Sequence, residues 1–145
     1  YLFIEGESRK VGPVYIPETL ACSMKTGRKV LLTASLDTRV RRILSEYPIK
    51  DPETLSKVDA ILKTLKQQLG KKLVNHLCNC LKQGEFKEFV TILLEEYYDP
   101  KYQYGMRNYR YDLELDAEDL DQVQTGLVEF RNQQKNVRQD HPFVE

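Results

Sequence analysis

The sequence has no tryptophan, only three cysteines and no long uninterrupted hydrophobic run in its 145 residues. Three cysteines are too few for a disulfide framework and leave one thiol unpaired, which favours a reducing compartment. No segment approaches the roughly 20 consecutive apolar residues that a membrane-spanning helix needs, and the N-terminus lacks the pattern of a signal peptide. These absences predict a soluble, cytoplasmic protein.

The chain also lacks an excess of either charge, because 22 Lys and Arg residues balance 22 Asp and Glu residues. No global field therefore attracts it to nucleic acid or to a membrane, and such binding would depend on local patches. The hydrophobic content of 41% is enough to form a core. The composition indicates a globular chain with one ordinary domain or two small ones.

The cysteines and histidines do not follow a zinc-binding pattern. Cys78 and Cys80 lie two positions apart on a predicted helix and face different directions. No second Cys or His pair stands at ligand spacing. Cys22, His76 and His141 likewise lack partners for metal binding or nucleophilic catalysis. We therefore expect no zinc, and structural or incidental roles for these residues.

Two short apolar runs, residues 1–4 and 30–34, read as buried strands. Between them, Pro17 suits the start of a helix and Gly27 its end. A strand, a helix and a second strand predict a parallel pair of α/β type. A glycine-rich phosphate-binding loop ending in Lys and Ser or Thr is absent from the sequence.

Charged and hydroxyl side chains follow both predicted strands. Because ligands of open α/β sheets bind beyond the carboxyl ends of the strands, we expect these side chains to share one rim. An acid after an apolar strand can hold Mg²⁺ or orient water, and arginines can neutralise phosphate oxygens. The alternative is a solvated turn between strand and helix. The rim comprises Glu5, Glu7, Ser8, Arg9 and Lys10 together with Ser35, Arg39, Arg41 and Arg42.

The middle of the chain has the periodicity of amphipathic helices. Residues 51–70 begin with Asp51 as the N-cap and end at Gly70, and two further helices are predicted over 71–82 and 85–97. Short connections favour antiparallel packing into a bundle. Because a residue before proline avoids helical geometry, we expect the last of these helices to end near Asp99.

The C-terminal part combines a strand and a helix. Residues 109–115 alternate between apolar and polar side chains, which is typical of a half-buried strand. Asp116 then caps a last helix, which precedes a polar tail. We thus expect three segments: an α/β segment over 1–48, a helical bundle over 49–100, and a strand with a helix and tail over 101–145.

Two surfaces are candidates for RNA binding. Residues 97–111 interleave six tyrosines with basic side chains, a combination that stacks bases and contacts phosphates. The first bundle helix and its turn are rich in lysine, which can follow an RNA backbone. Core packing of the tyrosines and a solvated lysine face remain the alternatives. The candidates are Tyr102, Tyr104, Arg107, Arg110, Lys63, Lys66 and Lys71.

Three segments in order carry a resemblance to a known family: "EGESRKVGPVYIPETLACSM", "LDTRVRRILSEY" and "LLEEYYDPKY". With them the chain resembles the C-terminal part of the tRNA 2-selenouridine synthases. The resemblance implies an upstream rhodanese domain with a catalytic cysteine, a P-loop domain and a helical extension. It predicts that the chain is a fragment, an α/β remnant of the P-loop domain with two parallel strands, followed by a mainly α-helical domain.

The resemblance also implies a function and co-substrates. The family replaces the sulfur of 2-thiouridine, at the wobble position of the tRNA anticodon stem-loop, by selenium from selenophosphate. Geranyl diphosphate serves to form an S-geranyl intermediate. We therefore expect a tRNA-modifying transferase whose partners are tRNA and the missing rhodanese and P-loop segments, with no membrane partner. The isolated fragment is expected to be inactive.

Within the family motif, Glu5, Glu7, Ser8, Arg9 and Lys10 match the usual pattern, and Gly6 occupies its variable position. The resemblance implies that Glu5 or Glu7 orients Mg²⁺ or a phosphate-bound water, with Glu7 as the candidate Mg²⁺ ligand. The expected contacts to diphosphate or selenophosphate are Ser8, Arg9, Lys10, Arg39 and Arg42.

Two other classes stay open at this point. The first is a non-catalytic helical interaction or RNA-binding module, in which the charged rim is ordinary surface. The second is a relative of small-molecule kinases, suggested by a strand followed by an arginine-rich helix. The long helical extension and the Tyr98-Asp99-Pro100 segment fit the kinase hypothesis less well.

Overall fold

The computed structural model describes residues 2–6, 10–49, 51–106 and 109–139. The chain divides into two compact units. Unit 1 combines residues 1–33 with 110–145, and unit 2 comprises residues 34–109. This grouping differs from the expected segments 1–48, 49–100 and 101–145, because the two ends of the chain fold together.

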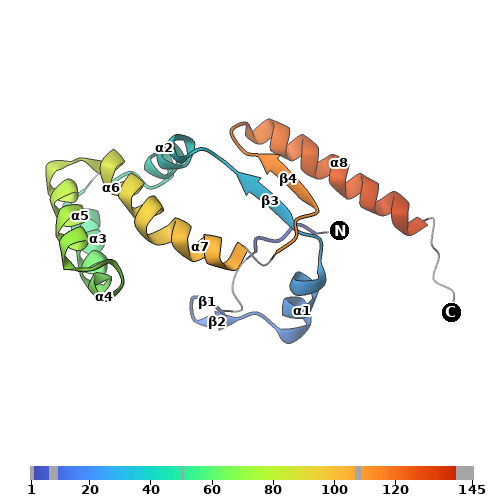
Figure 1. The fold of residues 1–145 in the computed structure, drawn as a ribbon, viewed down its shortest axis with the longest axis horizontal. Helices are drawn as coiled ribbons and strands as arrows, with labels where there is room; N and C mark the ends of the chain where they lie inside the picture. The colour runs from blue at the N-terminus through green and yellow to red at the C-terminus, as the bar shows by residue number, and fades with distance from the viewer. Residues whose placement is uncertain (1, 7–9, 50, 107–108, 140–145) are drawn as a thin grey trace. The chain divides into compact units, whose positions relative to one another are not determined.

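The centre of unit 1 is a parallel pair of strands, β3 (Val30–Thr33) and β4 (Leu113–Asp116), which lie side by side in Figure 1. Their register pairs Val30 with Leu113 and Thr33 with Asp116. Asp112 fixes this register, because its backbone N–H donates to the Lys29 carbonyl (2.8 Å) and its side chain accepts from the Lys29 N–H (2.7 Å). The expected parallel pair is therefore confirmed.

One partner in that pair was predicted wrongly. The described part of the first run, residues 2–4, forms no strand, and β4 takes the position expected for it. The strand over 109–115 is also shorter at its start than predicted, since β4 begins at Leu113. The side chains of β4 alternate between half-buried and exposed, whereas Leu2 is 81% exposed.

The remaining elements of unit 1 are short except for the last helix. They are the antiparallel strands β1 (Lys10–Val11) and β2 (Val14–Tyr15), the helix α1 (Glu18–Thr26) and the helix α8 (Leu120–Gln139). Pro17 and Gly27 bound α1 as predicted. The cap of α8 differs from the prediction, because Asp119 rather than Asp116 accepts the backbone N–H groups of Asp121 and Gln122.

All regular secondary structure in the described part of unit 2 is helical. Its elements are α2 (Leu36–Glu46), α3 (Pro52–Thr64), α4 (Lys66–Leu69), α5 (Lys71–Gln83), α6 (Phe86–Leu93), the π-helical turn η1 (Leu94–Tyr98) and α7 (Asp99–Met106). Asp51 caps α3, accepting the Thr54 N–H at 2.8 Å, as predicted. Gly84, at φ 75°, ends α5 in the left-handed conformation that glycine tolerates.

The core of unit 2 joins four of these helices. Val40 from α2, Leu62 from α3, Leu77 from α5 and Phe89 from α6 are all buried in one cluster. Burial of this apolar surface is the main driving force that holds the helices together. Within the described ranges, no helix combines the length and apolar character required to cross a membrane.

The helix α7 was not predicted. The sequence places a helix end near Asp99, yet Asp99 adopts helical angles (φ −58°, ψ −43°) and starts α7. The π-helical turn η1 provides the reason, because the N–H of Asp99 bonds to the carbonyl of Leu94 and the wider turn leads into Pro100 at the first turn of α7. The Asp-Pro step therefore changes the type of helix without ending it.

Candidate functional site

Unit 1 contains a pocket of about 600 Å³ between its N-terminal segment, α1 and α8. It lies at the amino end of β3, where residues 27–30 contribute to its wall, and not at the carboxyl end where the rim was expected. The apolar lining consists of Leu2, Phe3, Ile4, Leu20, Met24, Val30 and Phe130. The polar lining consists of Ser23, Thr26, Arg28, Lys29, Arg131 and Gln134.

The three cations of the pocket differ in their pairing. Arg28 forms an ion pair with Asp112 at 2.6 Å, and the Lys29 ammonium donates to the carbonyl of Met24. The backbone N–H of Lys29 and the Arg28 guanidinium hold the pKa of Asp112 below its usual value. Both cations are therefore engaged within unit 1.

Arg131 retains unused hydrogen-bonding capacity. Its Nε is buried and has no hydrogen-bond partner among the described residues, and its Nη2 makes one long bond of 3.4 Å to Asn132. A buried donor without an acceptor is costly, and the long Nη2 bond leaves this end of the guanidinium able to donate to an anion. Apolar walls beside this guanidinium suit an anion that carries a hydrocarbon chain.

The residues of the expected rim do not form one site within either unit. Glu5 and Lys10 belong to unit 1, whereas Arg39 and Arg42 belong to unit 2. Glu5 is exposed and is not among the pocket-lining side chains, and Lys10 lies on β1 with its Nζ 5.5 Å from the Tyr15 ring centre. Glu7, Ser8 and Arg9 lie outside the described residues.

Arg39 has a structural partner that the sequence did not reveal. Its Nη1 and Nη2 donate to the two carboxylate oxygens of Asp99 at 2.6 and 2.9 Å. The hydrogen bond between them raises the pKa of Arg39 and lowers the pKa of Asp99. This bidentate pair joins α2 to α7, so both Nη groups of Arg39 are occupied within unit 2.

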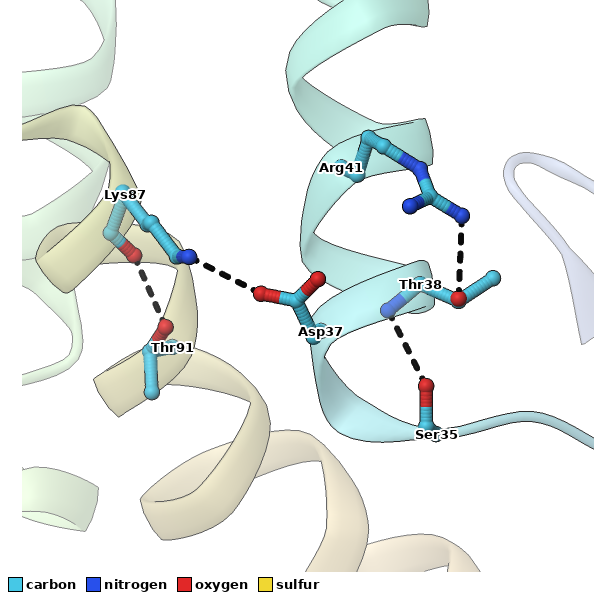
Figure 2. A network of polar contacts seen from close by, with 6 residues as sticks. All are labelled: Ser35, Asp37, Thr38, Arg41, Lys87 and Thr91. Atoms are coloured by element: carbon cyan, nitrogen blue, oxygen red, sulfur yellow. Dashed lines mark hydrogen bonds and ion pairs between the residues drawn. The ribbon is translucent and has the colours of Figure 1, made fainter.

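The other polar groups at the start of α2 form the network in Figure 2. Ser35 caps the helix by accepting the Thr38 N–H at 3.2 Å, and the Thr38 hydroxyl accepts from Arg41 at 3.0 Å. Asp37 pairs with Lys87 of α6 at 2.8 Å. These contacts give α2 a fixed start and an electrostatic tie to α6. The remaining candidate of this helix, Arg42, is half-buried.

The two predicted RNA-binding regions meet in unit 2. Lys101, in the first turn of α7, donates to Gln68 of α4 at 3.4 Å. Through this contact, the start of α7, which carries the exposed Tyr102, approaches α4. Lys66 lies on α4, and Lys71 begins α5 directly after it. Lys63 differs from these lysines, because Asp59 pairs with it at 2.5 Å.

The remaining RNA candidates do not join this surface. Arg110 is exposed but belongs to unit 1. Arg107 and the side chain of Tyr104 lie outside the described part of the structure. The surface that can be described therefore consists of Lys66, Lys71, Lys101 and Tyr102.

One group of chemically competent side chains was missed from the sequence. His76 and Cys80 of α5 and Glu88 of α6 bring a ring nitrogen, a thiol sulfur and a carboxylate oxygen within 4.8 Å of one another. The available signal was the i, i+4 spacing of His76 and Cys80 ahead of the turn at Gly84. The third side chain, Glu88, lies on the following helix α6, and the spacing of cysteines and histidines does not indicate it.

Comparison with known proteins identifies the family. A family model described as "tRNA 2-selenouridine synthase AAA domain" matches residues 1–134. The chain belongs to this family. The resemblance carried by the three sequence segments is thereby confirmed, and an AAA domain agrees with the P-loop origin expected for the parallel strands.

The curated relatives agree with the family match. A tRNA 2-selenouridine synthase of Hydrogenovibrio crunogenus is 32% identical over 124 residues, covering 73% of this chain and 34% of that protein. Another, of Marinobacter nauticus, is 29% identical over 130 residues, with 72% and 35% covered. An uncharacterized protein of Methanocaldococcus jannaschii is 26% identical over 137 residues, with 90% and 60% covered.

The chain spans about a third of the length of the two synthases (34% and 35%). No solved structure matches it. The relatives thus establish the family, and the pocket and surfaces described above are the local observations on which a functional proposal rests.

Proposed function

We propose that this chain is part of a tRNA-modifying transferase that replaces the sulfur of wobble 2-thiouridine by selenium. Selenophosphate supplies the selenium, and geranyl diphosphate first forms an S-geranyl intermediate. The observation that carries the proposal is the family match over residues 1–134. The names of the synthases of Hydrogenovibrio crunogenus and Marinobacter nauticus support the tRNA substrate.

In this proposal the pocket of unit 1 receives geranyl diphosphate. Its volume of about 600 Å³ lies in the range usual for small-molecule sites. Phe3, Met24 and Phe130 offer apolar contacts to the geranyl chain, while the Arg131 guanidinium, whose Nη2 makes only one long hydrogen bond, offers charge-assisted contacts to the diphosphate. A ligand with both parts would use the pocket more fully than diphosphate or a free terpene alcohol.

The family motif that begins at Glu5 is proposed to handle phosphate groups. Ile4 and Gly6 line the pocket, and Glu5 and Glu7 are their neighbours in sequence. Glu5 is exposed, so its carboxylate is accessible to a hydrated Mg²⁺ ion. When bound, Mg²⁺ would neutralise phosphate charge at Glu5 or Glu7. Ser8, Arg9 and Lys10 would contact the phosphate of one of the co-substrates.

The tRNA is proposed to contact unit 2. Lys66 and Lys71 are exposed and have no ion pair within the described ranges, and Tyr102 is 59% exposed and available for base stacking. Lys101 is held over the Tyr97 ring at 3.8 Å, which keeps one cation at the same helix end. These contacts would hold the RNA without reading its sequence.

A chimera tests the proposal. The chain replaces the matched segment of the Hydrogenovibrio crunogenus synthase, and the chimera is incubated with 2-thiouridine-containing tRNA, geranyl diphosphate and selenophosphate. Mass spectrometry of the nucleosides should show S-geranyl-2-thiouridine and then 2-selenouridine. The chain alone should produce neither.

The variants Glu5→Gln and Glu7→Gln in the chimera should each be compared with Glu18→Gln, a control carboxylate on α1. The proposal predicts a severe loss of nucleoside conversion in either Glu5→Gln or Glu7→Gln, and near-normal conversion in Glu18→Gln. A chimera that is folded by circular dichroism and binds tRNA, but converts no nucleoside, would favour the non-catalytic RNA-binding module instead.

A further inference from the structure

The hairpin of α5 and α6 in unit 2 brings together three different metal-binding side chains. The Nε2 of His76 lies 3.2 Å from the Oε1 of Glu88, and the Sγ of Cys80 lies 4.0 Å from the same nitrogen. All three ligand atoms are within 4.8 Å of one another. The three atoms offer nitrogen, sulfur and oxygen, which are all ligand types of Zn²⁺.

The distances agree with tetrahedral coordination. With Zn–N and Zn–O near 2.0 Å and Zn–S near 2.3 Å, neighbouring ligand atoms of a tetrahedral zinc lie roughly 3.3 to 3.6 Å apart. The His76–Glu88 distance of 3.2 Å already fits, and the Cys80–His76 distance of 4.0 Å needs to shorten by a few tenths of an ångström. The Cys80–Glu88 pair lies within 4.8 Å, so the exposed His76 and Glu88 side chains would both turn toward the buried sulfur on metal binding.

Local structure explains why these side chains converge. His76 and Cys80 are one helical turn apart on α5 and therefore share a face. Gly84 then ends α5 in a left-handed conformation, and the N–H of Glu85 bonds to the Cys80 carbonyl at 2.9 Å. This tight turn directs α6 back along α5, so that Glu88 faces the same pair.

The site is anchored on one side and open on the other. Cys80 is 1% exposed and packs in the core of unit 2, which fixes the sulfur. The side chains of His76 and Glu88 are each 51% exposed. An ion bound here would have three protein ligands and a fourth position open to water, the arrangement of zinc sites that retain an exchangeable ligand.

We propose that His76, Cys80 and Glu88 bind one Zn²⁺ ion, or a similar thiophilic divalent cation, through Nε2, Sγ and a carboxylate oxygen. The site belongs to unit 2, whereas the proposed geranyl diphosphate pocket belongs to unit 1, and the site does not depend on the proposed function. Zn²⁺ displaces the thiol proton of Cys80 to solvent as the Zn–S bond forms, with no change of oxidation state. The sequence-based expectation of no zinc overlooked this arrangement.

Cobalt substitution provides the test. The 145-residue chain, prepared without a polyhistidine tag, is titrated with Co²⁺ under anaerobic, reducing conditions that use a non-thiol reductant. One equivalent should bind and produce a thiolate-to-cobalt charge-transfer band with the intense visible absorption of tetrahedral Co²⁺. Addition of one equivalent of Zn²⁺ should abolish both signals.

Matched variants assign the ligands. His76→Ala and Glu88→Gln change exposed residues, so both should stay folded, and each should weaken Zn²⁺ binding by more than the roughly tenfold that loss of an outer-shell partner costs. Cys80→Ser should remove the charge-transfer band, whereas Cys78→Ser and Asn75→Ala should retain it. Absence of the band in the folded parent chain, or equal affinity of His76→Ala and the parent, would overturn the proposal.

Discussion

Arg39 and Asp99, 60 positions apart in the sequence, are joined by two parallel hydrogen bonds of 2.6 and 2.9 Å. The pair ties the first turn of α2 to the start of α7, and its side chains are 35% and 26% exposed. Planar guanidinium and carboxylate groups in this geometry give directional as well as electrostatic stabilisation. The contact therefore explains why α7 has a fixed position in unit 2.

Removal of this pair should destabilise the folded chain. Asp99→Asn and Arg39→Gln are each expected to lower the free energy of unfolding by about 1–2 kcal/mol, a value reduced by partial exposure to solvent. The double variant should lower the free energy of unfolding by less than the sum of the two single variants, because both single changes remove the same interaction. Urea unfolding followed by circular dichroism measures this cycle. Exact additivity of the two single changes would show that the pair does not contribute.

Low pH should destabilise unit 2 through the carboxylate of Asp99. The Arg39 hydrogen bond lowers the pKa of Asp99 in the folded chain, whereas the unfolded chain keeps the ordinary value near 3.9. As the pH falls, the unfolded chain therefore binds more protons than the folded chain. The stabilising contribution of Asp99 is complete above about pH 5 and is lost as the pH decreases through the ordinary and then the lowered pKa. The hydrogen bonds from Thr54 lower the pKa of Asp51, which adds in the same direction.

The measurement is the urea midpoint between pH 7 and pH 3. The parent chain should lose stability below about pH 5, and Asp99→Asn should show a smaller decline because one of the linked groups is gone. Glu96→Gln, an exposed carboxylate change on η1, serves as the control. Equal slopes for the parent and Asp99→Asn would contradict the role of this pair.

Local signals were predictable from the sequence, whereas long-range partners were not. Pro17, Gly27 and Asp51 bound helices for reasons contained in a few neighbouring residues, and the structure agrees at each of them. The partner of β3 was assigned to residues 1–4, because strand periodicity identifies a strand but not its neighbour. The observed partner, β4, comes from the other end of the chain.

The same limit applies to the candidate sites. Arg39 was interpreted as a phosphate ligand because its acceptor, Asp99, is remote in sequence and was assigned to the end of a helix. The pocket depends on α1, α8 and the N-terminal segment meeting in unit 1, which no local motif encodes. By contrast, lysine and tyrosine on exposed helix ends could be recognised from composition, and Lys66 and Tyr102 are indeed exposed.

Charge reversal tests the proposed RNA surface. The double variant Lys66→Glu and Lys71→Glu should weaken tRNA binding several-fold and reduce the salt dependence of binding, since each lost phosphate contact lowers the slope by about one. The double variant Lys57→Glu and Lys87→Glu is the matched control, because these lysines are already paired, with Glu53 at 2.6 Å and with Asp37 at 2.8 Å. Filter binding at several salt concentrations gives both quantities. An equal loss for the control would indicate a general charge effect and not a binding surface.

The pocket of unit 1 is tested most directly by calorimetric titration of the chain with geranyl diphosphate. The account predicts one site, with weaker binding of inorganic diphosphate and of geraniol, and an affinity about tenfold lower in Arg131→Gln, because a charge-assisted hydrogen bond is lost. Lys57→Gln, which changes a cation of unit 2 that is paired with Glu53, should bind as the parent does. No binding by the folded parent, or the same affinity in Arg131→Gln, would contradict the assignment of this pocket.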